Sequence, residues 1–99
     1  MIAFVRFISI MPGKTPDALA IAHKIKKHAK EKHGSEVNLM MPIGGNPNRI
    51  AFVSTADHLA DLEGALEKIA ADAEWQKLIA DNAGNVIPGS VHDEIWRII

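Results

Sequence analysis

Apolar residues follow two different periods along the chain, and these predict four strands and three helices. Four segments are rich in β-branched and other apolar residues and end at turn residues, which is typical of strands. They are residues 2–10, 36–42, 49–55 and 90–99. In the intervening segments apolar residues recur three or four positions apart, which is typical of helices that bury one face. These segments are residues 16–33, 59–70 and 73–82.

The first helix has start and stop signals, and the two strands after it are joined by a turn. Thr15 is a favoured N-cap type, Pro16 suits the first helical position, and Asp17 complements the helix dipole. Gly34 is expected to end the helix. The segment "IGGNPN" (43–48) has the composition of a turn, so the flanking strands should form a hairpin.

The second helical region should break near Asp72. Trp75 is six residues after Ile69, and at about 100° per residue it falls on the far side of that helix. It is in phase with Leu78 and Ile79 instead. Because Asp is a good N-cap, Asp72 can begin a second short helix that turns Trp75 inward again.

The predicted order is β-α-β-β-α-β with an extra short helix before the last strand. This is the ferredoxin-like plan of the α+β class, in which an antiparallel sheet carries its helices on one face. We expect one domain over residues 1–99. Each predicted strand is apolar on both faces, although such a sheet needs only one apolar face. The surplus indicates that a second copy covers the other face, as a homodimer.

Composition restricts the classes of protein that the chain can belong to. It has 99 residues, 47% of them hydrophobic, a net charge of −1 and no cysteine. Disulfide scaffolds, thiolate metal sites and cysteine nucleophiles are therefore excluded. No window reaches the roughly 18 apolar residues of a membrane span, and no leader pattern is present, so we expect a cytoplasmic protein without a membrane partner.

Charge is unevenly distributed along the chain. Residues 23–33 hold five lysines and one glutamate, whereas residues 57–82 hold seven acidic residues and two lysines. A basic stripe can bind nucleic acid. The pI near 6.5 is far from that of basic nucleic-acid-binding domains. We therefore interpret the pattern as a basic helix beside an acidic one, and we expect no nucleic-acid partner.

The order of elements resembles the dimeric α/β-barrel superfamily, and in particular its small members similar to NIPSNAP proteins and antibiotic-biosynthesis monooxygenases. The segments that carry the resemblance are "MPGK" (11–14) after the first strand and "ADAEWQKLIAD" (71–81) before the last. The resemblance implies a dimer whose two sheets close into a barrel, with a pocket between sheet and helices in each subunit. Members include cofactor-free monooxygenases, haem-degrading enzymes and isomerases, so the fold does not assign a reaction.

The sequence departs from the haem-degrading members at all three of their characteristic positions. Arg6 stands where the resemblance implies an Asn, Ser54 and Thr55 stand where a Trp is expected, and no His lies near Ala65. Ala73 also replaces the Pro that commonly follows the Asp of the short helix. We therefore expect no haem chemistry and no cofactor.

A single cation, Arg6, interrupts the apolar row of the first strand. A buried guanidinium needs a partner, and the midpoints of the first and last strands suggest Glu94. Counting in the same register, the other expected neighbours on this face are Phe4 opposite Trp96 and Ile8 opposite His92. If this face lines the pocket, Arg6, Glu94 and His92 are the candidate catalytic groups; the alternative is an ordinary ion pair.

The long helix and the short helix should complete the pocket. Leu62 and Leu66 are expected to roof it, and Trp75 either forms a wall or fills the space. We therefore expect Phe4, Ile8, Leu62, Leu66, Trp75 and Trp96 to contact a ligand.

No metal or nucleotide site is expected from the remaining motifs. His23, His28 and His33 recur every five residues, which turns neighbours apart by roughly 140° on a helix. A zinc pair on a helix prefers the i, i+4 spacing, so we interpret these histidines as a solvated face. The "IGGNPN" segment is neither a G-x-G-x-x-G motif nor a P-loop.

Two functions remain open at this stage. The first is binding of a small apolar or aromatic molecule in an apolar pocket, oriented by a few polar groups. The alternative is a cofactor-independent monooxygenase or isomerase acting on a small aromatic or polyketide-like compound. In that case Arg6 would stabilise an oxyanion and His92 would act as the base.

Overall fold

A computed structural model describes residues 1–99 and contains the four strands and three α-helices expected. The strands are β1 (Ile2–Ser9), β2 (Asn38–Met40), β3 (Arg49–Ala56) and β4 (His92–Arg97). The helices are α1 (Thr15–His33), α2 (Leu59–Ala70), α3 (Ala73–Asp81) and the 3-10 turn η1 (Ala83–Asn85). The sheet order is β2-β3-β1-β4 with antiparallel neighbours, which confirms the ferredoxin-like α+β fold.

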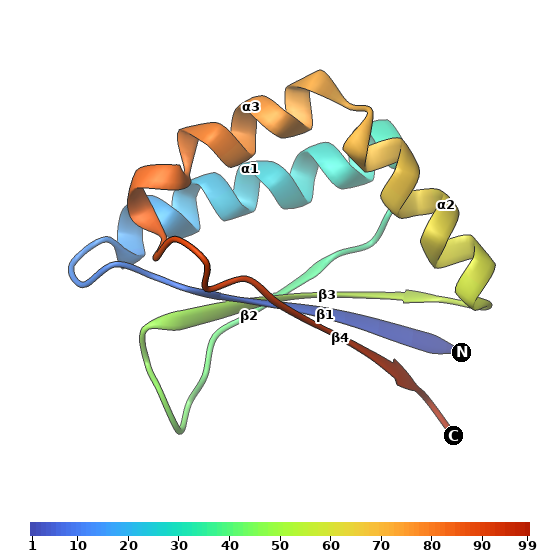
Figure 1. The fold of residues 1–99 in the computed structure, drawn as a ribbon, viewed down its shortest axis with the longest axis horizontal. Helices are drawn as coiled ribbons and strands as arrows, with labels where there is room; N and C mark the ends of the chain where they lie inside the picture. Colours follow the sequence, from blue (N-terminus) through green and yellow to red (C-terminus); the bar gives the residue numbers. More distant parts are fainter.

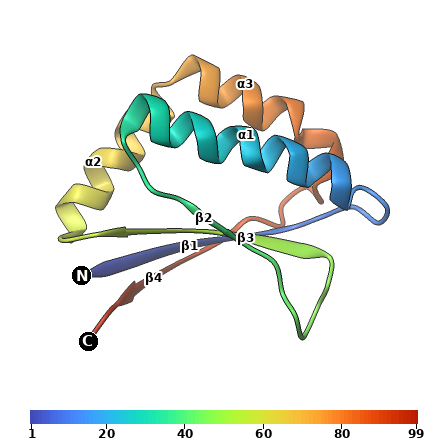
Figure 2. The ribbon, with the colours of Figure 1, turned by 180° about the vertical axis from the view of Figure 1, so that it is seen from behind.

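All three α-helices lie on one face of the sheet, and the other face is uncovered (Figures 1 and 2). The layer between helices and sheet holds a small core, in which Ile10 and Ile50 are fully buried beside Ala18 and Ala22. Only 10 of 99 residues are buried, so one copy of the chain encloses little apolar volume. No helix is long and apolar enough to cross a membrane.

The ends of α1 agree with the expected signals to within one residue. Thr15 is the first helical residue rather than the cap; Lys14 occupies the N-cap position and makes no side-chain cap hydrogen bond. Gly34 ends the helix with a φ of +66°, and its N–H donates to the Lys30 carbonyl at 3.1 Å. A left-handed residue is needed there, and glycine adopts that conformation without a Cβ clash.

The break between α2 and α3 occurs where the sequence predicted it. Asp72 is the N-cap of α3, and its Oδ1 accepts hydrogen bonds from the N–H groups of Glu74 (3.0 Å) and Trp75 (3.3 Å). The new axis of α3 runs alongside α1 (Figure 1). The basic and acidic helices are therefore neighbours, as expected from the charge pattern.

The register between β1 and β4 differs by one residue from the predicted one. Arg6 lies opposite Asp93, and Glu94 lies opposite Val5. Successive side chains on a strand point to opposite faces, so this single step moves a whole set of residues to the other side of the sheet. Glu94, His92 and Trp96 were expected beside the pocket and instead lie on the uncovered face.

The physical reason for the wrong register is the part of β1 that pairs with β4. The prediction matched the midpoints of residues 2–10 and 90–99, whereas β4 pairs only with residues 2–7 of β1, so the centre of the paired segment of β1 lies nearer its N-terminus. Hydrogen bonds at both ends fix this alignment. The Ser9 N–H donates to Ser90 Oγ at 3.2 Å, and the Ile98 N–H donates to the Met1 carbonyl at 2.9 Å.

Candidate functional site

An apolar cavity of about 370 Å³ lies between the sheet and the helices. Five of the residues expected to contact a ligand line it: Phe4, Ile8, Leu62, Leu66 and Trp75. Further lining residues come from α1, β3, α3 and the segment before β4, including Ile25, Phe52, Ile79, Val86 and Val91. The cavity lies where the sequence predicted a pocket; that its lining residues bind a ligand stays a prediction.

Trp75 forms part of the cavity wall. It stands on the first turn of α3, where its N–H is held by the Asp72 cap, and its side chain is half-buried. Its ring lies 6.4 Å from that of His28, measured between centroids. Of the two roles expected for Trp75, the wall of a cavity fits this placement, because open volume remains beside it.

Arg6 projects into the cavity wall and is paired with Asp93 instead of Glu94. Its Nε and Nη2 donate to the two carboxylate oxygens at 2.8 and 2.9 Å, which is the bidentate geometry of a strong pair. The hydrogen bonds that Arg6 donates to Asp93 raise the pKa of Arg6 against the opposing effect of burial. The same bonds lower the pKa of Asp93. Both groups therefore stay ionised, and the pair is neutral as a unit.

Few other polar groups reach the cavity. Ser35, Ser54 and Asn82 line it, and the Asn82 Oδ1 accepts a hydrogen bond from Asn85 Nδ2 at 3.0 Å. The guanidinium of Arg6 has five N–H donors, of which the Asp93 pair uses two. The cavity thus combines a large apolar surface with one strong donor group.

His92, Glu94 and Trp96 form a separate group on the uncovered face of the sheet. Glu94 accepts from the Trp96 Nε1–H at 2.9 Å, and His92 Nε2 lies 3.0 Å from the same carboxylate. The His92 ring stacks on Phe7 with centroids 6.1 Å apart. The expectation that these three residues line the pocket with Arg6 is wrong, because the register turns them away from it.

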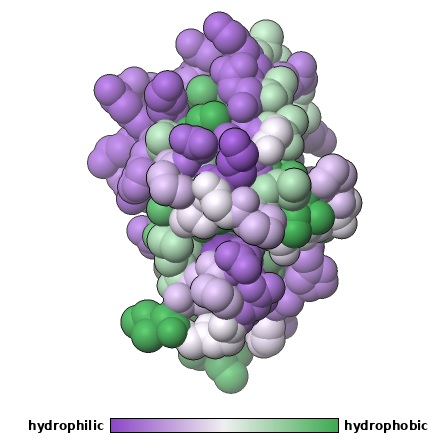
Figure 3. Space-filling model, turned by 90° about the vertical axis from the view of Figure 1, so that its left-hand side faces the viewer, coloured by the Kyte–Doolittle hydropathy of each residue, from purple (hydrophilic) through white to green (hydrophobic).

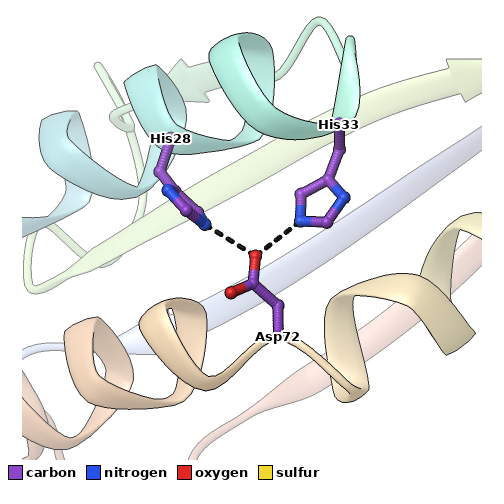
Figure 4. A group of neighbouring side chains, drawn as sticks. All are labelled: His28, His33 and Asp72. Atoms are coloured by element: carbon purple, nitrogen blue, oxygen red, sulfur yellow. Dashed lines mark hydrogen bonds and ion pairs between the residues drawn. The ribbon is translucent and has the colours of Figure 1, made fainter.

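A buried histidine–carboxylate cluster was missed by the sequence reasoning. His28 and His33 of α1 converge on Asp72 Oδ2, at 2.7 and 2.6 Å from their Nε2 atoms (Figure 4). Hydrogen bonds from His28 and then His33 hold the pKa of Asp72 well below its usual range, despite its burial. The interpretation of these two histidines as solvated is wrong, since each side chain is only 12% exposed.

The missed cluster has a simple explanation. A five-residue spacing separates two side chains on a helix, but His33 is the last residue of α1, and the carboxylate between the two rings comes from another helix. The available signal was Asp72 itself, which caps a helix that returns along α1.

Comparison with known proteins supports the fold and no more. No protein-family model matches the chain, and no curated protein matches it in sequence. Among solved structures, an uncharacterised NIPSNAP domain protein from Burkholderia xenovorans matches with a TM-score of 0.83 at 18% identity. That match covers 100% of this chain and 95% of the other. A NIPSNAP family protein from Agrobacterium tumefaciens matches with a TM-score of 0.80 at 19% identity, over 99% and 85% of the two chains.

A third structure extends the comparison to another group of proteins. A candidate antibiotic biosynthesis monooxygenase from Nitrosomonas europaea matches with a TM-score of 0.75 at 12% identity, over 100% and 99% of the two chains. These likenesses agree with the resemblance found in the sequence. At such low identity they establish a shared fold, and the chemistry must be argued from the residues of this chain.

Proposed function

We propose that this protein binds a small, mostly apolar molecule that carries one neutral hydrogen-bond acceptor, such as a ketone or quinone oxygen. The observation that carries the proposal is the apolar cavity with the Arg6–Asp93 pair in its wall. Small-molecule sites are typically concave and apolar, with a few polar groups that fix the ligand's orientation.

The volume of the cavity limits the size of the ligand. At roughly 30 Å³ for each water-sized group, 370 Å³ holds about a dozen non-hydrogen atoms. This suits a bicyclic aromatic molecule or a short polyketide fragment. It is also above the lower end of about 300 Å³ that is common for ligand sites.

The ion pair favours a neutral acceptor over a carboxylate. Asp93 already neutralises Arg6, so a second anion at the guanidinium would bring a negative charge that no cation compensates. A carbonyl oxygen can instead accept one of the remaining N–H groups without separating the pair.

The monooxygenase or isomerase alternative has weaker support. The fold is shared with a candidate antibiotic biosynthesis monooxygenase. The base proposed for such a reaction was His92, whose ring stacks on Phe7 on the other face of the sheet. The residues that line the cavity include no histidine that could replace it as the base, so ligand binding is the function that the site supports best.

We also propose that the protein works as a homodimer through the uncovered face of the sheet. Apolar residues remain accessible on that face, among them Met40 and Trp96, and the core of a single copy is small. From the side that carries the β1–α1 turn, hydrophilic residues dominate over the helices (Figure 3). The sheet is thus the better face for a second copy. A cytoplasmic location stays a prediction.

Binding can be tested with Trp75 as the reporter. In a Trp96→Phe background Trp75 is the only tryptophan, and it lines the cavity. We expect 2-acetylnaphthalene to change its fluorescence in a saturable way, and 2-naphthoate, which has the same rings and a negative charge, to bind at least about tenfold more weakly. A tenfold difference corresponds to about 1.4 kcal/mol.

Two matched variants locate the binding. Ala65→Phe should abolish the response because Ala65 lines the cavity, whereas Ala80→Phe, on the exposed side of α3, should leave it unchanged. Absence of a saturable response to either compound, or equal responses in the two variants, would contradict the proposal.

A further inference from the structure

The cluster around Asp72 joins ligand atoms from two separate regions of the chain. The Nε2 atoms of His28 and His33 lie 2.7 and 2.6 Å from Asp72 Oδ2, and the three possible ligand atoms are all within 4.8 Å of one another (Figure 4). The Asp72 side chain is 1% exposed. The two rings meet edge to face, with centroids 5.8 Å apart. Two imidazoles and one carboxylate oxygen therefore point at one small volume.

The two oxygens of Asp72 have different roles. Oδ1 caps α3 by accepting from the Glu74 and Trp75 N–H groups. Oδ2 accepts no backbone bond and faces the two histidines. The carboxylate can therefore bind a cation through Oδ2 while the helix cap stays intact.

Glu74 supplies an outer partner for His28. Its Oε2 lies 3.3 Å from His28 Nδ1, the ring nitrogen that points away from Asp72. A histidine that binds a metal through one nitrogen usually donates its other N–H to a carboxylate or carbonyl, which fixes the ring and raises its basicity. His28 has this arrangement, with Nε2 toward the cluster and Nδ1 toward an acid.

We propose that His28, His33 and Asp72 bind a divalent transition-metal cation of the zinc type. The Nε2 atoms of both histidines and Asp72 Oδ2 are the protein ligands, and water completes a tetrahedral shell. Two imidazoles with one carboxylate is a ligand set that such metals take readily. The proposal is independent of the function proposed for the apolar cavity.

Only small movements are needed to load the site. Ligand atoms at about 2.0–2.1 Å from a tetrahedral zinc are about 3.3 Å apart. The present N···O contacts of 2.6–2.7 Å must open by roughly 0.6 Å. Any proton on Nε2 must leave that nitrogen as the cation enters, to solvent from a charged ring or to Nδ1 of the same ring from a neutral one. A groove of about 280 Å³ beside His33, lined also by Ser35 and Lys68, gives water and the cation access.

Lys32 is the lysine within ion-pair distance of Asp72, and its charge opposes a bound cation. Its Nζ lies 3.5 Å from Asp72 Oδ1, but the side chain is mostly exposed and can turn into solvent. Its position gives a further expectation: Lys32→Gln should raise the affinity for the metal, because it removes a like charge from the site.

The metal would fasten α1 to the junction of α2 and α3. His28 also lies against Trp75, so the cation would hold one wall of the cavity through this contact. The expected role is structural, since the three ligands lie outside the set of side chains that line the apolar cavity.

The test uses the full chain after treatment with a chelator, with Zn²⁺ and Co²⁺ as probes. We expect Zn²⁺ to raise the melting temperature and Co²⁺ to give the visible absorption of a tetrahedral site. His28→Gln and His33→Gln should lose both signals. His23→Gln is the matched control, because His23 is exposed on the same helix and belongs to no cluster. Glu74→Gln should weaken binding by about 10-fold or more.

The result is decisive whether or not a variant is less stable. Far-UV circular dichroism before metal addition shows which variants are folded, and Lys32→Gln tests the site without removing a ligand. The proposal is wrong if the folded wild-type chain shows neither signal. It is equally wrong if His23→Gln reduces binding as much as His33→Gln does, or if Lys32→Gln lowers the affinity.

Discussion

At the scale of single residues, the pairing of Arg6 decides what the cavity wall can do. The sequence shows that a lone cation in an apolar strand needs an acid, and the structure supplies one. Composition alone cannot tell Asp93 from Glu94, because both are acids and the choice depends on a register fixed at the two ends of β4. The type of interaction was therefore predictable, and the partner was not.

The Arg6–Asp93 pair can be measured by a double-mutant cycle. We expect a coupling energy of about 1 kcal/mol between Arg6→Ala and Asp93→Ala, measured by urea unfolding. The value is well below the loss of 3–5 kcal/mol seen for a broken buried pair, because the two side chains are 34% and 39% exposed.

The control for this cycle is the partner that the strand midpoints suggested. Arg6→Ala with Glu94→Ala should give a coupling energy near zero, since Glu94 lies on the other face and bonds to His92 and Trp96. Coupling to Glu94 as strong as to Asp93 would contradict the observed register.

The lowered pKa of Asp93 should make the free energy of unfolding depend on pH. Its pKa is lowered in the folded chain by the hydrogen bond from Arg6, so its contribution is fully present above the unfolded value of about 3.9. That contribution is lost as the pH falls from there toward the folded value. Unfolding free energies measured from pH 6 down to about pH 2 should fall less steeply for Asp93→Asn than for the wild type.

A surface carboxylate provides the comparison for the pH series. Asp57→Asn, at an exposed position before α2, should keep the acid dependence of the wild-type chain. Equal flattening by both substitutions would mean that the Arg6 bond does not cause the dependence.

At the scale of elements, local signals placed the helices well and the cluster between them badly. The phase of Trp75 and the capping ability of Asp72 located the α2–α3 break. The N-cap of α1 was predicted one residue too late, at Thr15 instead of Lys14. No side-chain hydrogen bond caps that end of the helix, so no side chain fixes the position of the cap. The spacing of His28 and His33 could not reveal their meeting, since it depends on how α3 lies against α1.

Two glycines, one just after a helix and one inside a helix, allow the effect of backbone conformation to be distinguished from that of packing. A Cβ added at Gly34 or at Gly64 would meet nothing within 4 Å, so neither substitution causes a clash. Gly34→Ala should destabilise the protein by about 1 kcal/mol, because residue 34 has a φ of +66°. Gly64→Ala, inside α2, should stabilise it by about 0.5–1 kcal/mol through helix propensity. Chemical denaturation of the two variants should show opposite signs, and destabilisation by both would indicate that space, not φ, is limiting.

At the scale of the whole molecule, the layered arrangement followed from the sequence. The order of periodic segments is compatible with few topologies, and β-α-β-β-α-β gives one sheet with helices on one face. Apolar residues on both faces of the strands pointed to a second covered surface, and the structure leaves the face opposite the helices open (Figure 2). A second copy of the chain on this face must be tested by measuring the oligomeric state in solution.

Two neighbouring residues of β4 provide that test. Trp96 and Ile95 are similarly exposed, at 58% and 55%, but they point to opposite faces of the sheet, with Trp96 on the uncovered one. A stable interface buries about 1,200–2,000 Å² in total, and a charge at its centre is costly to desolvate. Trp96→Glu should therefore shift sedimentation from dimer toward monomer at micromolar concentrations, whereas Ile95→Glu should leave the dimer intact. A wild-type chain that sediments as a monomer at tens of micromolar, or a dimer that only Ile95→Glu disrupts, would place the second copy elsewhere or remove it altogether.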